Sequence, residues 1–296
     1  MGAAATQTFL LTVTQPPAVT SGKGAAFFVG HASRFTITTT GFPLATLSKS
    51  GTLPAGVTFT DNGDGTATLT GTPLLGSDSR TPYSFTVQAS NGVGAVAGQI
   101  FTLTIALAAP MGLTPSGSVV AVNGYDKPTF SWTASAGADH YSLIVHDDNT
   151  GASPIIVPNV NGTSYVATAA QALTPGHRFT MSVYAISANS RTNSLATQTF
   201  SLAALPMPTL TSPIAGTKAS PLRFTWSAVA GAARYYLYVV DDTTGTVAIS
   251  NPNIMVNSFS LASPLTRGHK YTWRVAVVST NNLFGIWSAA QDFKIA

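Results

Sequence analysis

The 296-residue sequence contains no cysteine and no glutamate, and charged residues make up only 8% of it. A typical globular protein has about 25% charged residues. Without cysteine the chain has neither disulfides nor thiolate metal ligands. Without glutamate it lacks the residue that closes the usual calcium-binding loop with two oxygens. All ten acidic residues are therefore aspartates.

The basic residues give a net charge of +4, but they form no run. Nucleic-acid-binding proteins usually carry a clustered basic stripe, so we expect no nucleic-acid partner. No apolar stretch approaches the roughly 20 residues of a membrane-spanning helix, and we expect no membrane insertion. The first residues lack the charged start and long apolar segment of a signal peptide. We expect the chain to be part of a longer protein, to be processed, or to be exported by another route.

Motifs for catalysis and cofactor binding are missing from the sequence. There is no Gly-x-Ser-x-Gly elbow, no phosphate-binding loop and no dinucleotide fingerprint. Five histidines are present, and none forms a close metal-binding pair; they are His31, His140, His146, His177 and His269. We predict a protein that is not an enzyme and has no cofactor. A site built between modules from residues without a recognisable motif stays open as an alternative.

The residues that are abundant favour strands and turns. Thr, Ser, Ala, Val and Gly dominate, and 18 prolines are spread along the chain. Several segments alternate between apolar and polar residues, as half-buried strands do. One such segment contains Tyr141, Leu143 and Val145, and it has a counterpart in Tyr235, Leu237 and Val239; a second pair begins at Phe179 and Tyr271. We predict an all-β fold built from sandwiches.

Four short motifs occur twice, in the same order and at nearly constant spacing. The pairs are FSW 130–132 and FTW 224–226, AGADHY 136–141 and AGAARY 230–235, DDNTG 147–151 and DDTTG 241–245, and LTPGHRF 173–179 and LTRGHKY 265–271. They indicate two copies of one module, at 108–204 and 205–296. Trp132 and Trp226 lie on early strands, and we expect them in the two cores.

These two copies resemble fibronectin type III-like bacterial modules. The resemblance rests on the strand-borne tryptophan, the later tyrosine strand and the LTPGHRF lead into an alternating strand. It implies a β-sandwich that acts as a spacer or a binding surface. It implies no catalytic residue, because function belongs to sites and not to the fold.

The first module, residues 15–107, resembles the immunoglobulin-like, cadherin-like repeat of bacterial surface and secreted proteins. The motifs that carry this resemblance are GTLPAGVTF 51–59 and TLTGTP 68–73, followed by strands at 83–92 and 101–105. The resemblance implies an adhesive or architectural role in a large exported protein, and it brings no catalytic residues.

Residues 1–14 contain an orphan strand. Its segment 5–14 (ATQTFLLTVT) resembles residues 98–106 (GQIFTLTIA), which we expect to close the first module. One interpretation is the closing strand of a preceding repeat, with Gln15, Pro16 and Pro17 as the linker. A second is a donor strand that inserts Phe9, Leu11 and Val13 into another copy of the chain. A third is that the segment is the first strand of module one.

The stretch DNGDG at 61–65 is the most metal-like motif. Its third position is a glycine and no glutamate follows, so it departs from the calcium-loop pattern. Alternating segments flank it, and Asn-Gly and Asp-Gly suit a tight hairpin turn. We predict a hairpin, and we name Asp61 and Asp64 as a weak Ca²⁺ candidate.

The doublets Asp147-Asp148 and Asp241-Asp242 look like paired carboxylates. Neighbouring strand residues point to opposite faces, and turn residues follow each doublet. We therefore assign them to turns. His177 and His269 occupy equivalent turn positions, and we expect them to bond loops or lie on the surface.

Exposed aromatic residues are the remaining candidates for binding. Tyr236 and Tyr238 fall on the strand face opposite Tyr235, and copy two has Ser142 and Ile144 at their positions. Trp287 has Leu195 as its counterpart. Flat aromatic groups can stack on sugar rings or anchor a protein partner, so we predict a ligand-binding role for Tyr236, Tyr238 and Trp287. Packing against a loop or a neighbouring module is the alternative.

We predict an all-β, elongated, tandem array of three immunoglobulin-like or fibronectin III-like sandwiches, at 15–107, 108–204 and 205–296, joined by short proline-containing linkers. The predicted function is a non-catalytic extracellular structural or adhesive segment of a bacterial surface or secreted protein. One alternative is a filament or virion subunit that assembles by strand donation. Another is a carbohydrate-binding accessory region of a polysaccharide-degrading enzyme. Expected partners are other protein modules, copies of the chain itself, or polysaccharide.

Overall fold

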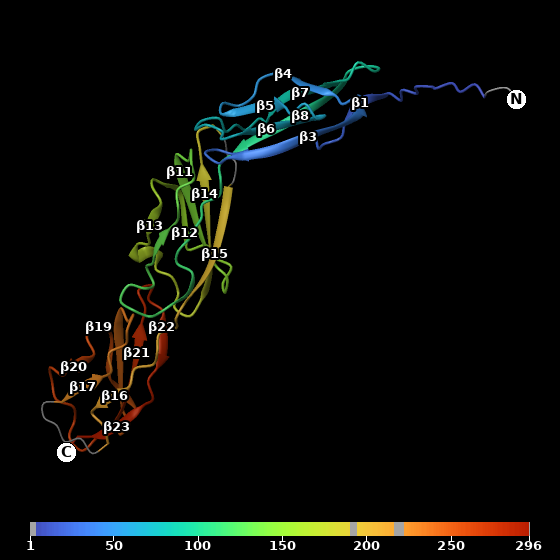
Figure 1. The fold of residues 1–296 in the computed structure, drawn as a ribbon. Coiled ribbons are helices and arrows are strands. Elements are labelled where there is room, and N and C mark those ends of the chain that lie inside the picture. The colour runs from blue at the N-terminus through green and yellow to red at the C-terminus, as the bar shows by residue number, and fades with distance from the viewer. Residues whose placement is uncertain (1–3, 190–193, 216–221, 296) are drawn as a thin grey trace. The chain divides into compact units, whose positions relative to one another are not determined.

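The computed structural model describes residues 4–189, 194–215 and 222–295. In these ranges the chain is built of β-strands joined by turns, with one 3₁₀ turn, η1 (Ala169–Gln171), and no α-helix (Figure 1). None of the described residues belongs to a helix long and apolar enough to cross a membrane. The prediction of an all-β fold with several sandwich sheets is confirmed.

Two compact units make up the chain. One comprises residues 1–110, 134–141 and 184–195, and the other comprises residues 111–133, 142–183 and 196–296. Every described sheet is formed by strands from a single stretch of sequence, within 15–106, 117–202 or 210–294. The three domain boundaries named above stay a prediction.

The first group of strands forms two four-stranded sheets. One sheet has the order β1 (Gln15–Val19), β3 (Ser33–Phe42), β6 (Thr66–Gly71), β5 (Val57–Asp61), and the other β2 (Gly24–Phe28), β8 (Ala97–Ala106), β7 (Tyr83–Ser90), β4 (Thr46–Ser50). All neighbours are antiparallel except β2 and β8. Ile37, Leu69 and Leu103 are completely buried, and the rings of Phe35 and Phe101 lie 5.1 Å apart across the two sheets.

The predicted linker at Gln15, Pro16 and Pro17 is wrong, because these residues begin strand β1. Gln15 pairs with Phe42 of β3, and the register shifts before Ala18. β1 lies at the edge of its sheet. Proline is tolerated there because an edge strand does not need every backbone N–H for pairing.

The second group of strands forms a two-stranded and a five-stranded sheet. The first pairs β10 (Thr129–Ser131) with β13 (Ser164–Val166), and the second has the order β12 (Ile155–Val160), β11 (His140–Asp147), β14 (Arg178–Ile186), β15 (Ser194–Leu202), β9 (Gly117–Val119). Phe200 contacts both Phe130 and Phe179, with ring centres 6.0 and 5.4 Å apart.

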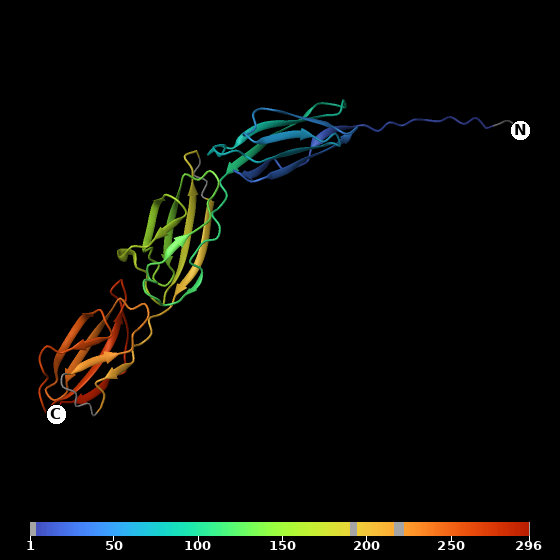
Figure 2. The ribbon, with the colours of Figure 1, turned by 60° about the vertical axis from the view of Figure 1, so that its left-hand side comes forward.

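The third group repeats this plan, and the views in Figures 1 and 2 show its strands in orange and red. One sheet has the order β16 (Leu210–Ser212), β17 (Arg223–Trp226), β20 (Ser258–Ser260), and the other β19 (Thr246–Ile254), β18 (Arg234–Asp241), β21 (Lys270–Val278), β22 (Phe284–Trp287), with β23 (Gln291–Lys294) also paired to β21. Phe224 packs edge-on against Trp273 with ring centres 5.0 Å apart.

The predicted inward faces of the repeated strands are confirmed. At most 5% of each of these side chains is exposed: Tyr141, Leu143, Val145, Phe179, Met181, Val183, Ala185, Tyr235, Leu237, Val239, Tyr271, Trp273, Val275 and Val277. Trp132 and Trp226 are buried as expected. Each large side chain buried in this way contributes about 1.5–3 kcal/mol to folding.

Candidate functional site

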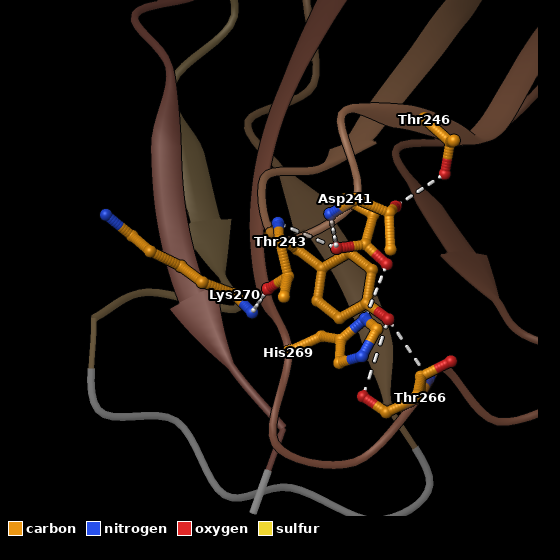
Figure 3. Close-up of polar contacts among 8 residues, drawn as sticks. Asp241, Thr243, Thr246, Thr266, His269 and Lys270 are labelled. Atoms are coloured by element: carbon orange, nitrogen blue, oxygen red, sulfur yellow. Dashed lines mark hydrogen bonds and ion pairs between the residues drawn. The ribbon is translucent and has the colours of Figure 1, made fainter.

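An aspartate and a histidine bind each other in both copies of the repeat. In the third group of strands, Nδ1–H of His269 donates to Oδ2 of Asp241 over 2.7 Å (Figure 3). In the second group, His177 and Asp147 make the same contact at 2.8 Å. The aspartates are buried, and about a quarter of each histidine side chain is exposed. The contact joins the turn after β18 to the turn before β21, and the turn after β11 to the turn before β14.

The second oxygen of each aspartate holds its own turn. Oδ1 of Asp241 accepts the backbone N–H groups of Thr243 and Thr244, at 2.9 and 3.3 Å. The N–H of Gly245 donates to the Asp241 carbonyl at 2.7 Å and closes the turn. Asp147 binds its turn in the same way, through the N–H groups of Asn149 and Thr150. Both oxygens of each aspartate are therefore engaged in holding turns.

These contacts shift the aspartate pKa values. Burial raises the pKa of Asp147 and of Asp241, since it disfavours the charged form. The hydrogen bonds from the histidines and from the turn N–H groups outweigh burial, and both pKa values lie below the ordinary value. Each carboxylate is thus kept ionised by its folded surroundings.

The second aspartate of each doublet points away from the first. Thr272 Oγ1 donates to Asp242 at 2.7 Å, and Thr180 Oγ1 donates to both oxygens of Asp148 at 3.0 Å. Asp148 also lies 3.5 Å from the guanidinium of Arg178. The doublets therefore do not form carboxylate pairs, and the structure agrees with the turn assignment made from sequence.

In the third group of strands, a tyrosine also stabilises the turn before β21. The hydroxyl of Tyr271 accepts the backbone N–H of Thr266 at 3.0 Å. Sequence reasoning treated Tyr271 only as a core residue. A tyrosine a few residues after a turn, at the start of a late strand, is the signal that could have indicated this corner. Copy two has Phe179 at this position and has no hydroxyl to offer.

The DNGDG stretch is a hairpin turn, as predicted. It connects the antiparallel strands β5 and β6, and Gly63 and Gly65 both have positive φ. Asp61 accepts the N–H groups of Leu47 and Gly63 at 3.0 and 3.2 Å. Asp64 accepts the N–H and the hydroxyl of Thr66 at 3.0 and 2.6 Å, and these bonds lower its pKa.

The described residues hold no group of three or more histidines and aspartates arranged to bind a metal ion. Asp61 accepts the N–H of Leu47 in β4 with one oxygen and that of Gly63 in the turn with the other, and Oδ1 of Asp64 accepts both bonds from Thr66. The weak Ca²⁺ assignment to these two residues stays a prediction.

The three aromatic residues named from sequence lie together on one face of the sheet, which we call the aromatic face (Tyr236, Tyr238 and Trp287). The Trp287 ring centre lies 5.2 Å from that of Tyr236 and 6.3 Å from that of Tyr238. Tyr236 and Trp287 both pair with Ala276 of β21, from opposite sides. Ala276 is completely buried, because the two rings cover it.

An arginine that sequence reasoning missed completes the aromatic face. The guanidinium carbon of Arg274 lies 4.8 Å from the Trp287 ring centre and 5.4 Å from that of Tyr238. Such cation–π contacts contribute about 0.5–1 kcal/mol each at exposed sites. Part of the Trp287 ring is therefore already occupied by a side chain of the same sheet. The pairing of Tyr238 with Arg274 across β18 and β21 is a tertiary relationship that a single sequence does not indicate.

The apolar residues of the predicted orphan strand are exposed. Residues 4–14 lie outside every strand, and residues 1–3 lie outside the described residues. Exposure reaches 81% for Phe9, 85% for Leu11 and 67% for Val13. The first strand of the first group is β1, which starts at Gln15, so the interpretation of 5–14 as that strand is wrong.

Solved structures of tandem domains resemble the chain. A three-domain titin crystal structure matches 93% of this chain and 97% of its own, with 12% identity and a TM-score of 0.34. The three fibronectin-type domains of chicken CNTN1 match 96% of this chain and 99% of their own, with 13% identity and a TM-score of 0.28. These likenesses concern the fold alone. No family model and no curated protein matches the sequence.

Proposed function

We propose that this chain is a non-catalytic structural or adhesive segment of an exported bacterial surface or secreted protein. The observation that carries the proposal is the Asp–His contact, which recurs in both copies and joins two turns each time. A catalytic aspartate–histidine pair is expected at one site, whereas a folding device is expected in every copy. The resemblance of residues 15–107 to bacterial surface repeats supports the extracellular location.

The way the described polar residues are used supports the same proposal. Aspartates at 61, 64, 147 and 241 all accept N–H groups of their own turns. Turns are the parts of a sandwich with the least packing, and hydrogen bonds to charged groups contribute about 1.5–3 kcal/mol each. These four aspartates thus stabilise turns, which suits a protein with a structural role.

Single-molecule force spectroscopy tests the structural function. The chain is held at both ends, stretched, relaxed and stretched again. We expect separate unfolding steps, each releasing roughly 30 nm for a sandwich of about 90 residues, and we expect the steps to return after relaxation. One unfolding event for the whole chain, or steps that fail to return, would contradict a structural role for tandem sandwiches.

The aromatic face supports a second candidate function, binding of a polysaccharide or a protein partner. Its three rings lie on the outward side of a sheet, each partly exposed, and Arg274 adds a positive charge. Aromatic residues and arginine are enriched at binding hot spots. The corresponding face in copy two has Ser142 and Ile144 in place of the tyrosines, so the two copies differ at this place. A screen of glycans and proteins, followed by alanine replacement of the three rings in the chain, tests this second function.

A further inference from the structure

Strand β19 has an open edge. It is the outermost strand of its sheet, and β18 is its one partner among the described strands. It has nine residues, which makes it the longest edge strand in the described sheets. Unpaired N–H and C=O groups along such an edge can accept a further strand.

The usual protection of an edge strand is absent from the first part of β19. Residues 246–251 (TVAISN) contain no charged residue and no proline. Three of the other edge strands carry such a residue: β4 has Lys49, β1 has Pro16 and Pro17, and β12 has Pro158. The edge strands β2 and β22 carry none, but they have only five and four residues, against nine in β19. Lysine and proline are the residues by which natural sheets prevent unwanted pairing.

Comparison of the two copies isolates one residue. Ala248 of β19 corresponds to Pro154 in copy two, and the equivalent strand β12 starts only at Ile155. In the pairing of β18 with β19, Val239 lies opposite Ile249 and Val240 lies opposite Val247. The register shifts between these two pairs, so Ala248 lies at an irregularity of the strand. The third group of strands therefore has an extended edge where the second group has a proline.

Apolar side chains lie uncovered at this edge. Val247 is 51% exposed, and Met255 and Val256, directly after β19, are 73% and 59% exposed. A strand added at residues 246–251 with apolar residues on one face would cover Val247, and burial of apolar area stabilises such a contact.

The chain itself contains an extended segment without a partner. Residues 4–14 have no charge, no glycine and no proline, and the alternating side chains of Phe9, Leu11 and Val13 are exposed. Threonine, phenylalanine and valine favour strands. Each of the three strand groups already contains a late strand at its end, β8, β15 or β23, so an incoming strand would have to add to an edge.

We propose that residues 8–13 of one copy add as a strand to the free edge of β19, at residues 246–251, in a second copy. The partner at this edge is thus another molecule of the same chain, and the contact links copies head to tail. The inference deepens the proposed structural function and rests on it. Backbone hydrogen bonds would supply affinity, and the alternating apolar residues would select the register. A head-to-tail contact that does not close a ring produces a filament.

The test measures the two sides of the contact separately. A fluorescent peptide of residues 4–14 is added to full-length chain carrying Phe9→Asp and Leu11→Asp, which block its own donor segment. Fluorescence anisotropy then reports binding. Ala248→Pro copies the second repeat, and Ala248→Lys adds a charge at the edge. Gln88→Lys is the matched control, because it places the same charge on an exposed position of the central strand β7. Circular dichroism confirms that each variant is folded.

We expect the peptide to bind the donor-blocked chain and its Gln88→Lys control equally. Both Ala248 variants should weaken binding at least about tenfold. Light scattering of the unaltered chain should show a mass that rises with concentration, and the donor-blocked chain should remain a monomer. Equal binding to all variants, or an unaltered chain that is monomeric at every concentration, would overturn the proposal. A monomer that still unfolds in separate steps under force would leave the structural function standing.

Discussion

The imidazole Nδ1 of His269 lies 2.7 Å from Oδ2 of Asp241, and this bond ties together two turns that are far apart in the sequence. The same relationship joins His177 to Asp147 in the neighbouring repeat. Because the contact is duplicated, its contribution to stability can be measured in one copy while the other copy serves as a reference.

The lowered pKa values of Asp147 and Asp241 predict loss of stability in acid. A group whose pKa is lower in the folded chain stabilises the fold above its unfolded pKa, about 3.9 for aspartate. That contribution is lost as pH falls through the folded value. We expect the melting temperature to fall steeply below about pH 4. Asp241→Asn should lower the melting temperature at pH 7 and change it far less at pH 2.

Thermal melting of Asp147→Asn, Asp241→Asn and the variant that carries both changes checks this prediction. Asp148→Asn is the control, since Asp148 binds Thr180 on the other side of the strand. A melting temperature of Asp241→Asn equal to that of the unaltered chain at pH 7 would show that the bond contributes nothing.

Removal of the Tyr271 hydroxyl should destabilise the third repeat by about 1 kcal/mol, because the N–H of Thr266 loses its acceptor. Tyr271→Phe makes this position like Phe179 of the second repeat. Chemical denaturation followed by tryptophan fluorescence measures the difference. Phe179→Tyr is the reciprocal variant. A loss in the free energy of unfolding of equal size in both variants would argue against a specific contribution of the Tyr271–Thr266 hydrogen bond.

The hairpin carboxylates predict insensitivity to calcium. Asp61 and Asp64 already accept four hydrogen bonds from Leu47, Gly63 and Thr66. We expect the same melting temperature with calcium and with a chelator. Asp61→Ala should cost about 1–3 kcal/mol, because the buried N–H of Leu47 loses its partner. A rise of several degrees with calcium that Asp64→Asn abolishes would instead establish the metal site.

If the aromatic face binds a ligand, the loss of its three rings should weaken that binding. A glycan array and a panel of extracellular matrix proteins are screened with the unaltered chain. For any ligand found, replacing Tyr236, Tyr238 and Trp287 with alanine should weaken binding at least about tenfold. Ile144→Ala, at the position in copy two equivalent to Tyr238, should leave binding unchanged. Retained affinity of the triple variant for every ligand would assign these rings to packing alone.

The contribution of Arg274 to the stability of the aromatic face can be measured on its own. Arg274→Lys keeps the charge but loses the flat stacking of the guanidinium on Trp287. We expect a loss of about 0.5–1 kcal/mol in stability from the weakened cation–π contacts. A stability equal to that of the unaltered chain would show that the stacking is energetically neutral.

Alternation and repetition made much of the fold predictable. The apolar inward residues of β11, β14, β18 and β21 could be named because strand side chains point to alternate faces with a period of two. Asp147 and Asp241, which end β11 and β18 and are also buried, were assigned to turns. The duplicated motifs indicated two equivalent modules, and Asn-Gly and Asp-Gly indicated the turn between β5 and β6. Each of these signals is local, so the sequence near the residue was sufficient. The same reasoning placed Tyr236 and Tyr238 on the outward face.

The tertiary structure decided which distant residues meet. Sequence assigned Asp241 and His269 to separate turns, and only the packing of β18 beside β21 brings them together. The same pairing places Arg274 beside Tyr238, and the register of β22 places Trp287 across Ala276. The tertiary structure also shows that Gln15 of the edge strand β1 pairs with Phe42 of β3. Sequence by itself determined the inward and outward faces of the repeated strands, because these follow from local periodicity. Partners across the sheets depend on strand order and register, which the whole fold sets.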